Sequence, residues 1–236
     1  MGTDENGQVQ EFGKKEMVKN VAKPFLFLAV LWVAYCACSG FGNASQGLAY
    51  FIILIVNTVI ISLLMKPDLL NERAHVKENV KKGDIIYALM VGRIGPLLMI
   101  VVCGLDTRFG WTAQYSQAIT LSAFAIMIAG LLFSDWAVIA NRYFSGVVRI
   151  QRERGHEVID TGPYRYVRHP GYLGSIVYNI ATPLILNSLS GFIPVALLVG
   201  ATIVRTKKED GYLKIELRGY KEYAEKTKYR LIPFIC

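Results

Sequence analysis

Residues 24–65 read PFLFLAVLWVAYCACSGFGNASQGLAYFIILIVNTVIISLLM, and no charged side chain interrupts them. A helix needs about 20 predominantly apolar residues to cross a bilayer, so this stretch is long enough for two crossings and the turn between them. The whole chain of 236 residues is 53% apolar and only 19% charged. Soluble domains carry about 25% charged residues. The sequence therefore predicts an all-α, polytopic membrane protein, and it argues against a soluble domain or a disordered chain.

Six apolar segments follow one another along the chain, and the last two are short. They are 24–43, 46–65, 85–105, 116–140, 172–187 and 191–204. At 1.5 Å per residue the last two would reach only about 21–24 Å, which is less than the ~30 Å hydrocarbon core. We therefore expect five to six membrane-embedded helices. The last two form either two thin crossings or a short hairpin that stops before the far side.

The basic residues alternate between the connections of these segments. Residues 1–23 hold four Lys and Arg, 66–84 five, 141–171 six and 205–236 nine, whereas the intervening connections together hold one. Lys and Arg mark the cytoplasmic side of a membrane protein, so both termini and most polar sequence are predicted to be cytoplasmic. The net charge of +8 lies beside apolar segments. This placement favours contact with anionic lipid headgroups, and no nucleic-acid partner is expected.

Two charged residues lie inside the predicted segments. Arg93 is in the third segment and Asp135 in the fourth, at similar predicted depths from the cytoplasmic face. Charged side chains are costly in the bilayer and usually have a partner there. We predict that these two form an ion pair. The alternative is that each side chain reaches the membrane surface separately.

A dense polar cluster precedes the fifth segment. Residues 155–174 read GHEVIDTGPYRYVRHPGYLG. Pro170 is typical of the first turn of a helix, and a helix N-terminus favours an anionic ligand group. The tyrosines and histidines could stack on a planar base, or they could simply anchor the helix at the interface. His156 and His169 have no third ligand at a suitable spacing, so we expect no metal.

A second cluster, RTKKEDGYL at residues 205–213, directly follows the last apolar segment. Arg205 and Glu209 are four residues apart and share one helix face, and Asp210 lies on the adjoining face. An exposed pair of this kind contributes only a few tenths of a kcal/mol. The two clusters flank the same hairpin and must meet at its mouth, which makes a functional site there more plausible than either cluster does alone. The tail from 205 to about 227 is predicted to form one or two amphipathic helices.

Together these motifs resemble the isoprenylcysteine carboxyl methyltransferase family and its relatives, the membrane phospholipid methyltransferases. The G-x-Y-x-x-x-R-H-P-x-Y pattern of the family corresponds to residues 162–172, and its R-x-x-x-E-E pattern corresponds to Arg205, Glu209 and Asp210. The family has Glu where this chain has Asp210. The resemblance covers roughly residues 140–236. With the apolar segments and the Lys and Arg counts, it predicts a cytosolic segment 1–23, membrane helices 24–140 and a catalytic region 141–236.

The resemblance implies an S-adenosylmethionine-dependent methyltransferase whose lipophilic acceptor enters from the bilayer. Arg205 and Glu209 would be the catalytic residues that face the transferred methyl group. The residues that would bind the cofactor are His156, Val158, Tyr164, Arg168, His169, Tyr172, Glu209 and Asp210.

The nature of the acceptor stays open at this point. An isoprenylcysteine carboxylate is already ionised and needs only a cation such as Arg205, whereas a phospholipid amine would need a base such as Glu209. Membrane sterol reductases, which use NADPH, share a related carboxy-terminal half, and a non-enzymatic membrane subunit is a further alternative. The Glu209–Asp210 pair favours the methyltransferase.

Overall fold

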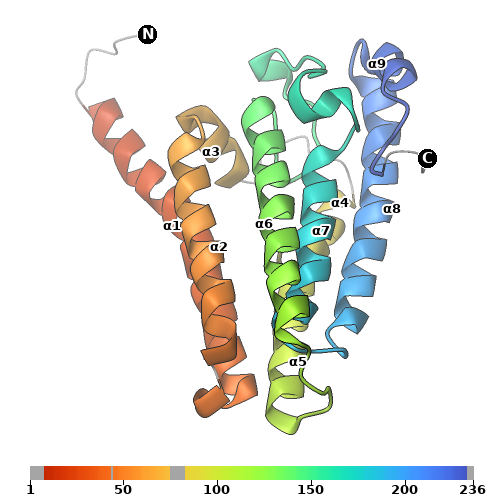
Figure 1. Ribbon diagram of the computed structural model, residues 1–236. Helices are drawn as coiled ribbons and strands as arrows, with labels where there is room; N and C mark the ends of the chain where they lie inside the picture. The colour runs from red at the N-terminus through yellow and green to blue at the C-terminus, as the bar shows by residue number, and fades with distance from the viewer. Residues whose placement is uncertain (1–7, 44, 75–82, 233–236) are drawn as a thin grey trace.

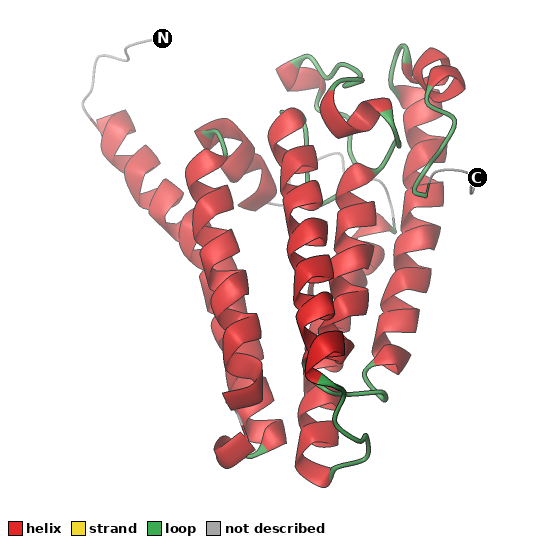
Figure 2. Cartoon of the chain, viewed as in Figure 1, coloured by secondary structure: helices red, strands yellow, loops and turns green. Residues whose placement is uncertain are grey.

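The computed structural model describes residues 8–43, 45–74 and 83–232, and this part of the chain is helical without any strand (Figure 2). Residues 1–7, at the start of the predicted cytosolic segment 1–23, and residues 233–236, at the end of the predicted catalytic region 141–236, lie outside the described residues. The helices are α1 (Gln8–Ser39), α2 (Ser45–Leu64), α3 (Pro67–Ala74), α4 (Asp84–Leu89), the π-helix η2 (Met90–Ile94), α5 (Gly95–Phe109), α6 (Gln117–Ala140), α7 (Pro170–Ile185), α8 (Phe192–Glu216) and α9 (Tyr220–Lys226). Short 3₁₀ turns occur at Phe41–Asn43, Arg152–Arg154 and Gly162–Arg165.

Four helical runs of the described chain are long and apolar enough to cross a membrane. They are Met17–Ser39, Gly47–Leu64, Asp84–Phe109 and Gln117–Ala140. They correspond to the first four predicted segments, and the third runs unbroken through α4, η2 and α5. The described part of the chain is thus all-α, and its four long apolar helices point to a multi-pass membrane protein. With 16 residues, α7 would reach about 24 Å, so a full crossing by the last two segments stays a prediction.

Helix α8 is longer than the sixth predicted segment. It continues without interruption from Phe192 to Glu216, so the last apolar segment and the second polar cluster share one helix. Its one proline, Pro194, lies in the first turn, where a missing N–H is tolerated, and the Lys and Glu residues of the later turns are good helix formers. Arg205 and Glu209 therefore stand on a rigid element. The amphipathic tail is this extension of α8 followed by the separate helix α9.

Helices α6 and α7 approach each other closely (Figure 1). A Cβ atom added to Gly174 of α7 would lie 2.6 Å from the carbonyl oxygen of Gly130 and 2.6 Å from the backbone nitrogen of Ser134, both on α6. Small residues allow such close packing of membrane helices. This contact sets the position of α7 relative to α6, and so also the position of the polar loop that joins them.

The tip of the α7–α8 hairpin is held by Asp106 near the end of α5. Its carboxylate accepts hydrogen bonds from the Ser188 hydroxyl (2.7 Å), the Ser190 hydroxyl, and the Thr112 hydroxyl (2.8 Å). Asn187 in the same turn accepts a hydrogen bond from the backbone N–H of Tyr115 at 2.8 Å. Asp106 lies about one turn before the end of α5. The hairpin tip is thus fixed close to the end of the bundle where α5 ends.

The predicted ion pair between Arg93 and Asp135 is wrong. The guanidinium of Arg93 lies 4.4 Å from the centre of the Phe27 ring, and it donates a hydrogen bond to its neighbour's backbone, the Gly92 carbonyl, at 3.0 Å. Asp135 instead interacts with Asn57 and Arg73. The prediction compared only the depths of the two residues. The direction in which each side chain leaves its helix decides the partner, and here the two side chains point to different neighbours.

Candidate functional site

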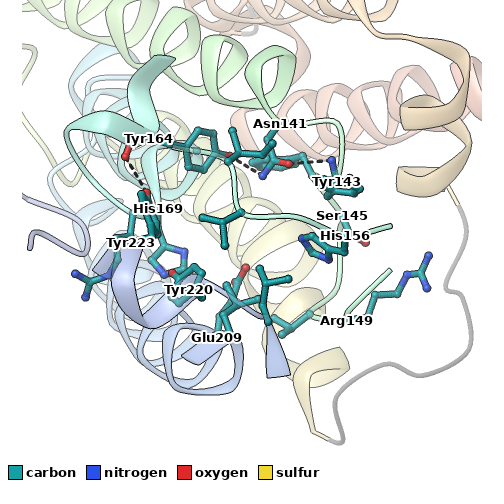
Figure 3. A pocket seen from close by; sticks show the side chains of 18 of the residues that line it. Asn141, Tyr143, Ser145, Arg149, His156, Tyr164, His169, Glu209, Tyr220 and Tyr223 are labelled. Atoms are coloured by element: carbon teal, nitrogen blue, oxygen red, sulfur yellow. Dashed lines mark hydrogen bonds between the residues drawn. The ribbon is translucent and has the colours of Figure 1, made fainter. Parts of the chain in front are cut away.

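A cavity lies at the end of the bundle that carries the α6–α7 loop, the end of α8 and α9 (Figure 3). Its empty space amounts to about 770 Å³, including the part open to solvent. From the loop side it is lined by Asn141, Tyr143, Phe144, Ser145, Val147, Val148, Arg149, His156, Glu157, Val158, Ile159, Tyr164, Arg168, His169, Gly171 and Tyr172, and from the tail side by Glu209, Leu213, Leu217, Tyr220 and Tyr223. The structure thus brings together seven predicted site residues: His156, Val158, Tyr164, Arg168, His169, Tyr172 and Glu209. Arg205 and Asp210 do not line the cavity.

The two sequence clusters meet directly at Tyr172 and Glu209. The hydroxyl of Tyr172, in the first turn of α7, donates a hydrogen bond to Glu209 Oε2 of α8 at 2.9 Å. Because both residues stand on helices, the orientation of the Glu209 carboxylate in the cavity is well defined. This contact confirms the expectation that the two clusters meet at the mouth of the hairpin.

His156 is held as a neutral ring in the wall of the cavity. It stacks on Tyr143 with the ring centres 4.4 Å apart, and its Nδ1 accepts a hydrogen bond from the Gln151 backbone N–H at 3.2 Å. Burial, together with the charges of Arg149 and Arg154, lowers the pKa of His156 to about 4. Since Nδ1 is an acceptor, the proton of the neutral ring is on Nε2.

Tyr164 forms another wall and is tied to both sides of the cavity. The Asn141 amide at the end of α6 donates a hydrogen bond to the Tyr164 hydroxyl at 3.2 Å, and the Tyr223 hydroxyl of α9 donates to the Tyr164 carbonyl at 2.8 Å (Figure 3). Tyr220 packs against Tyr223 with the ring centres 5.4 Å apart. The sequence analysis predicted the tail to form one or two amphipathic helices. Their role in the cavity depends on the folding back of the tail.

Arg168 fastens the tail to the loop. Its Nε and Nη2 donate to the two carboxylate oxygens of Asp210 at 2.7 and 3.2 Å, and its Nη1 donates to the carbonyls of Thr227 and Lys228 at 2.8 and 2.7 Å. The backbone N–H of Arg168 also donates to the Tyr229 carbonyl at 2.9 Å. Arg168 borders the cavity, but these contacts use nearly all donors of its guanidinium. We call this set of contacts between Arg168 and the tail the clamp.

Asp210 is the anionic centre of the clamp. Besides Arg168, it contacts Tyr220, whose hydroxyl donates at 3.0 Å, and Lys214 at 3.0 Å, while His169 Nε2 lies 3.5 Å away. Burial raises the pKa of Asp210, but contacts from His169, Arg168 and Lys214 outweigh this effect and hold the pKa well below its ordinary value. The sequence predicted Asp210 as a cofactor contact, and the structure places it behind the cavity wall.

Arg205 is paired with a residue that the sequence analysis did not consider. Its Nε and Nη2 donate to the carboxylate of Asp84 at 3.1 and 3.0 Å, and Nη2 also donates to the Gly146 carbonyl at 2.7 Å. Asp84 in turn accepts a hydrogen bond from the Val148 backbone N–H at 2.7 Å. Both side chains are buried, with 6% exposure each. The pair connects α4, α8 and the loop, and the Arg205 guanidinium lies 5.4 Å from the Tyr172 ring centre, outside the cavity lining.

A second buried pair that sequence reasoning missed supports the opposite side of the loop. Arg149 donates from Nε and Nη2 to the two carboxylate oxygens of Glu72 in α3, both at 2.8 Å, and also contacts Glu153 at 2.6 Å. Arg149 and Glu72 are 5% and 3% exposed. In the sequence both residues look like ordinary charged residues of membrane-flanking connections. No sequence signal identifies them, because the pair forms only when α3 packs against the loop.

The comparisons with known proteins concern the part of the chain that builds this cavity. Residues 121–215 match the model of the isoprenylcysteine carboxyl methyltransferase family. The chain is 36% identical over 113 residues to a probable protein-S-isoprenylcysteine O-methyltransferase of Oryza sativa subsp. indica, which covers 47% of this chain and 59% of that protein. It is 31% identical over 113 residues to protein-S-isoprenylcysteine O-methyltransferase B of Arabidopsis thaliana, covering 47% and 57%. It is 38% identical over 99 residues to protein-S-isoprenylcysteine O-methyltransferase of Saccharomyces cerevisiae, covering 41% of each chain.

These matches span about half the length of the relatives. The residues that match the family model include most of α6, the loop with His156 and Tyr164, the hairpin, and Glu209. They do not include α1 to α5, which contribute Glu72 and Asp84 to the support of the loop. Residues 121–215 of this chain are thus similar to the isoprenylcysteine carboxyl methyltransferase family.

Proposed function

We propose that this protein is a membrane methyltransferase that transfers a methyl group from S-adenosylmethionine to the carboxylate of an isoprenylcysteine. The observation that carries the proposal is the Tyr172–Glu209 hydrogen bond inside a cavity built mostly by the family-matched residues. The relatives are named for this reaction on isoprenylcysteine. The substrate would be a prenylated protein or another lipophilic molecule with the same carboxylate.

The residues of the cavity fit S-adenosylmethionine in charge. Its sulfonium is a cation, which favours a carboxylate and aromatic faces over unpaired arginines. Glu209 supplies the carboxylate. Arg149 and Arg168 line the cavity too, but each is neutralised by a buried carboxylate partner, Glu72 and Asp210 respectively. The site therefore does not repel a cationic cofactor.

The cavity also fits the adenosine part of the cofactor. The stacked pair of Tyr143 and His156 offers a flat aromatic wall, and the neutral His156 presents its Nε2–H as a donor. The tail side adds Tyr220, Tyr223 and Leu217. We assign adenosine binding to these residues and the neighbourhood of the transferred methyl group to Tyr172 and Glu209. Arg168 and Asp210 act as positioning residues because they hold the tail in place.

For this reaction the protein has to orient the reacting groups and exclude water from them. S-adenosylmethionine, when bound, supplies an activated methyl group. A carboxylate acceptor is ionised at neutral pH, so no base is needed, and alignment supplies most of the rate enhancement. The Tyr172 hydroxyl fixes the Glu209 carboxylate at 2.9 Å. The tail, held by Arg168, lines one side of the cavity.

Methyl transfer by the purified full-length protein in detergent tests the proposal. Labelled S-adenosylmethionine and an N-acetylated S-prenylcysteine should yield the labelled methyl ester. Glu209→Gln should reduce single-turnover transfer more than S-adenosylhomocysteine affinity, and Glu222→Gln, at an exposed position of α9, serves as the matched control. Transfer only to a phospholipid amine would overturn the proposed acceptor. Thermal stabilisation by NADPH and not by S-adenosylhomocysteine would overturn the reaction class.

We further propose that the cavity and both termini face the cytoplasm. The support is the alternation of Lys and Arg between the connections of the membrane helices. A cysteine introduced at the exposed Lys221 of α9 should resist a membrane-impermeant thiol reagent added to intact cells. It should react after the cells are permeabilised. Labelling in intact cells would contradict the proposal and show that α9 faces the outside.

A further inference from the structure

An anionic acceptor needs a cation near the reacting groups. Three buried arginines lie around the cavity, but each is already paired with a carboxylate. Arg149, Arg168 and Arg205 each donate two hydrogen bonds to a single carboxylate, with lengths between 2.7 and 3.2 Å. Such a bidentate pair uses the charge and most donors of the guanidinium. None of the three is therefore well placed to bind a further carboxylate, including Arg205, which the sequence pattern indicated for this role.

Arg73, in the last turn of α3, differs from these three. Its guanidinium lies 4.9 Å from the centre of the ring of Phe144, which lines the cavity. The carbonyl of Arg73 is 3.9 Å from the position of a Cβ atom added to Gly146, so the end of α3 packs against the lining loop. The side chain is accessible. Among the described residues, no carboxylate lies within 4.0 Å of its guanidinium.

The Phe144 ring connects Arg73 to the neighbourhood of Tyr172. A Cβ atom added to Gly171 would lie 2.7 Å from this ring, and Gly171 directly precedes Tyr172, the hydrogen-bond partner of Glu209. The charge of Asp135 acts on Arg73 from a distance, but its carboxylate is not in contact with the guanidinium. An accessible guanidinium without a carboxylate in contact can form charge-assisted hydrogen bonds with an anion.

We propose that Arg73 binds the carboxylate of the methyl acceptor and holds it toward Tyr172 and Glu209. The proposal rests on the proposed function and assigns the recognition of the acceptor to a residue outside the family-matched segment 121–215. A planar guanidinium can grip both oxygens of a carboxylate, which a single ammonium group cannot. Methylation turns the carboxylate into a neutral ester. The product therefore loses its attraction to Arg73, which favours its release.

The test compares an acid with its own ester. Affinities for an N-acetylated S-prenylcysteine and for its methyl ester are measured on the full-length protein in detergent. The variants are Arg73→Ala, Arg73→Gln and Arg73→Lys, with Arg142→Ala as the matched control. The exposed Arg142 also lies beside the cavity, with its guanidinium 4.7 Å from the Tyr143 ring centre. S-adenosylhomocysteine binding reports whether each variant is folded.

In the wild-type protein the acid should bind more tightly than the ester. Arg73→Ala and Arg73→Gln should weaken acid binding about tenfold or more, while ester and S-adenosylhomocysteine affinities change less than about twofold. Arg73→Lys should recover part of the preference, and Arg142→Ala should retain it. The proposal is overturned if folded Arg73 variants keep the preference of the wild type for the acid, or if Arg142→Ala loses it equally. If the wild-type protein transfers no methyl group to prenylcysteine, the proposed function itself fails, which is a separate outcome.

Discussion

Removing the charge of Asp84 tests whether Arg205 supports the fold rather than the chemistry. Asp84 accepts two hydrogen bonds from Arg205, at 3.0 and 3.1 Å, and one from the Val148 N–H at 2.7 Å, and it is only 6% exposed. Asp84→Asn keeps the shape and one acceptor but leaves the Arg205 guanidinium buried without a carboxylate. Stranding one member of a buried pair costs about 3–5 kcal/mol. Arg205→Met, which strands Asp84 instead, should cost a similar amount.

The double variant Asp84→Asn/Arg205→Met should cost less than the sum of the two single changes. The reason is that the second substitution no longer strands a charge, so a coupling of about 1–3 kcal/mol is expected. Free energies of unfolding are measured in mixed micelles for the wild type, the two single variants and the double variant, which together form a double-mutant cycle. The exposed pair of Arg152 and Glu216, at 78% and 36% side-chain exposure, is the matched control. Its cycle should give a coupling below about 1 kcal/mol.

Two results would refute this reasoning. If the single changes at Asp84 and Arg205 add within about 0.5 kcal/mol, the pair does not stabilise the fold as a unit. If Arg205→Met is as stable as the wild type but loses methyl transfer with S-adenosylhomocysteine binding intact, Arg205 acts in the reaction, as the sequence pattern suggests. The cycle and single-turnover transfer on the same variants separate these two roles.

Three further changes probe the packing, the cavity wall and the tail. Gly174→Ala places a Cβ 2.6 Å from α6 backbone atoms and should lower the free energy of unfolding by about 1–3 kcal/mol, whereas Gly200→Ala meets nothing within 4 Å and should not destabilise. Because the pKa of His156 is lowered to about 4 from 6.5, the folded state binds fewer protons between these values. Acidification through this window should therefore reduce the thermal stability of the wild type relative to that of His156→Gln, and a pH-independent difference would contradict this assignment. Arg168→Gln removes the charge facing Asp210 and should expose the tail beyond α9 to limited proteolysis and weaken S-adenosylhomocysteine binding; an equally protected tail would disprove the clamp.

The membrane architecture could be predicted because it depends on local properties of the chain. Each apolar run forms a helix by itself, since a bilayer offers no water to the backbone and a helix satisfies its own N–H and C=O groups. Pro170 marks the start of α7 for the same local reason. The meeting of Tyr172 and Glu209 was predictable as well, because a hairpin of known length returns its two ends to one place.

The partners of the charged residues were decided by the tertiary structure alone. Arg205 takes a carboxylate that lies 121 positions earlier in the sequence, and Arg149 takes one 77 positions earlier. The similar depths of Arg93 and Asp135 in the sequence suggested an ion pair, but the two side chains have different partners in the structure. The apolar length of a segment is a property of that segment, whereas an ion pair requires two helices to have a given rotation and separation. Close contacts such as Gly174 against Gly130 set that rotation and separation, and they exist only once the helices have packed.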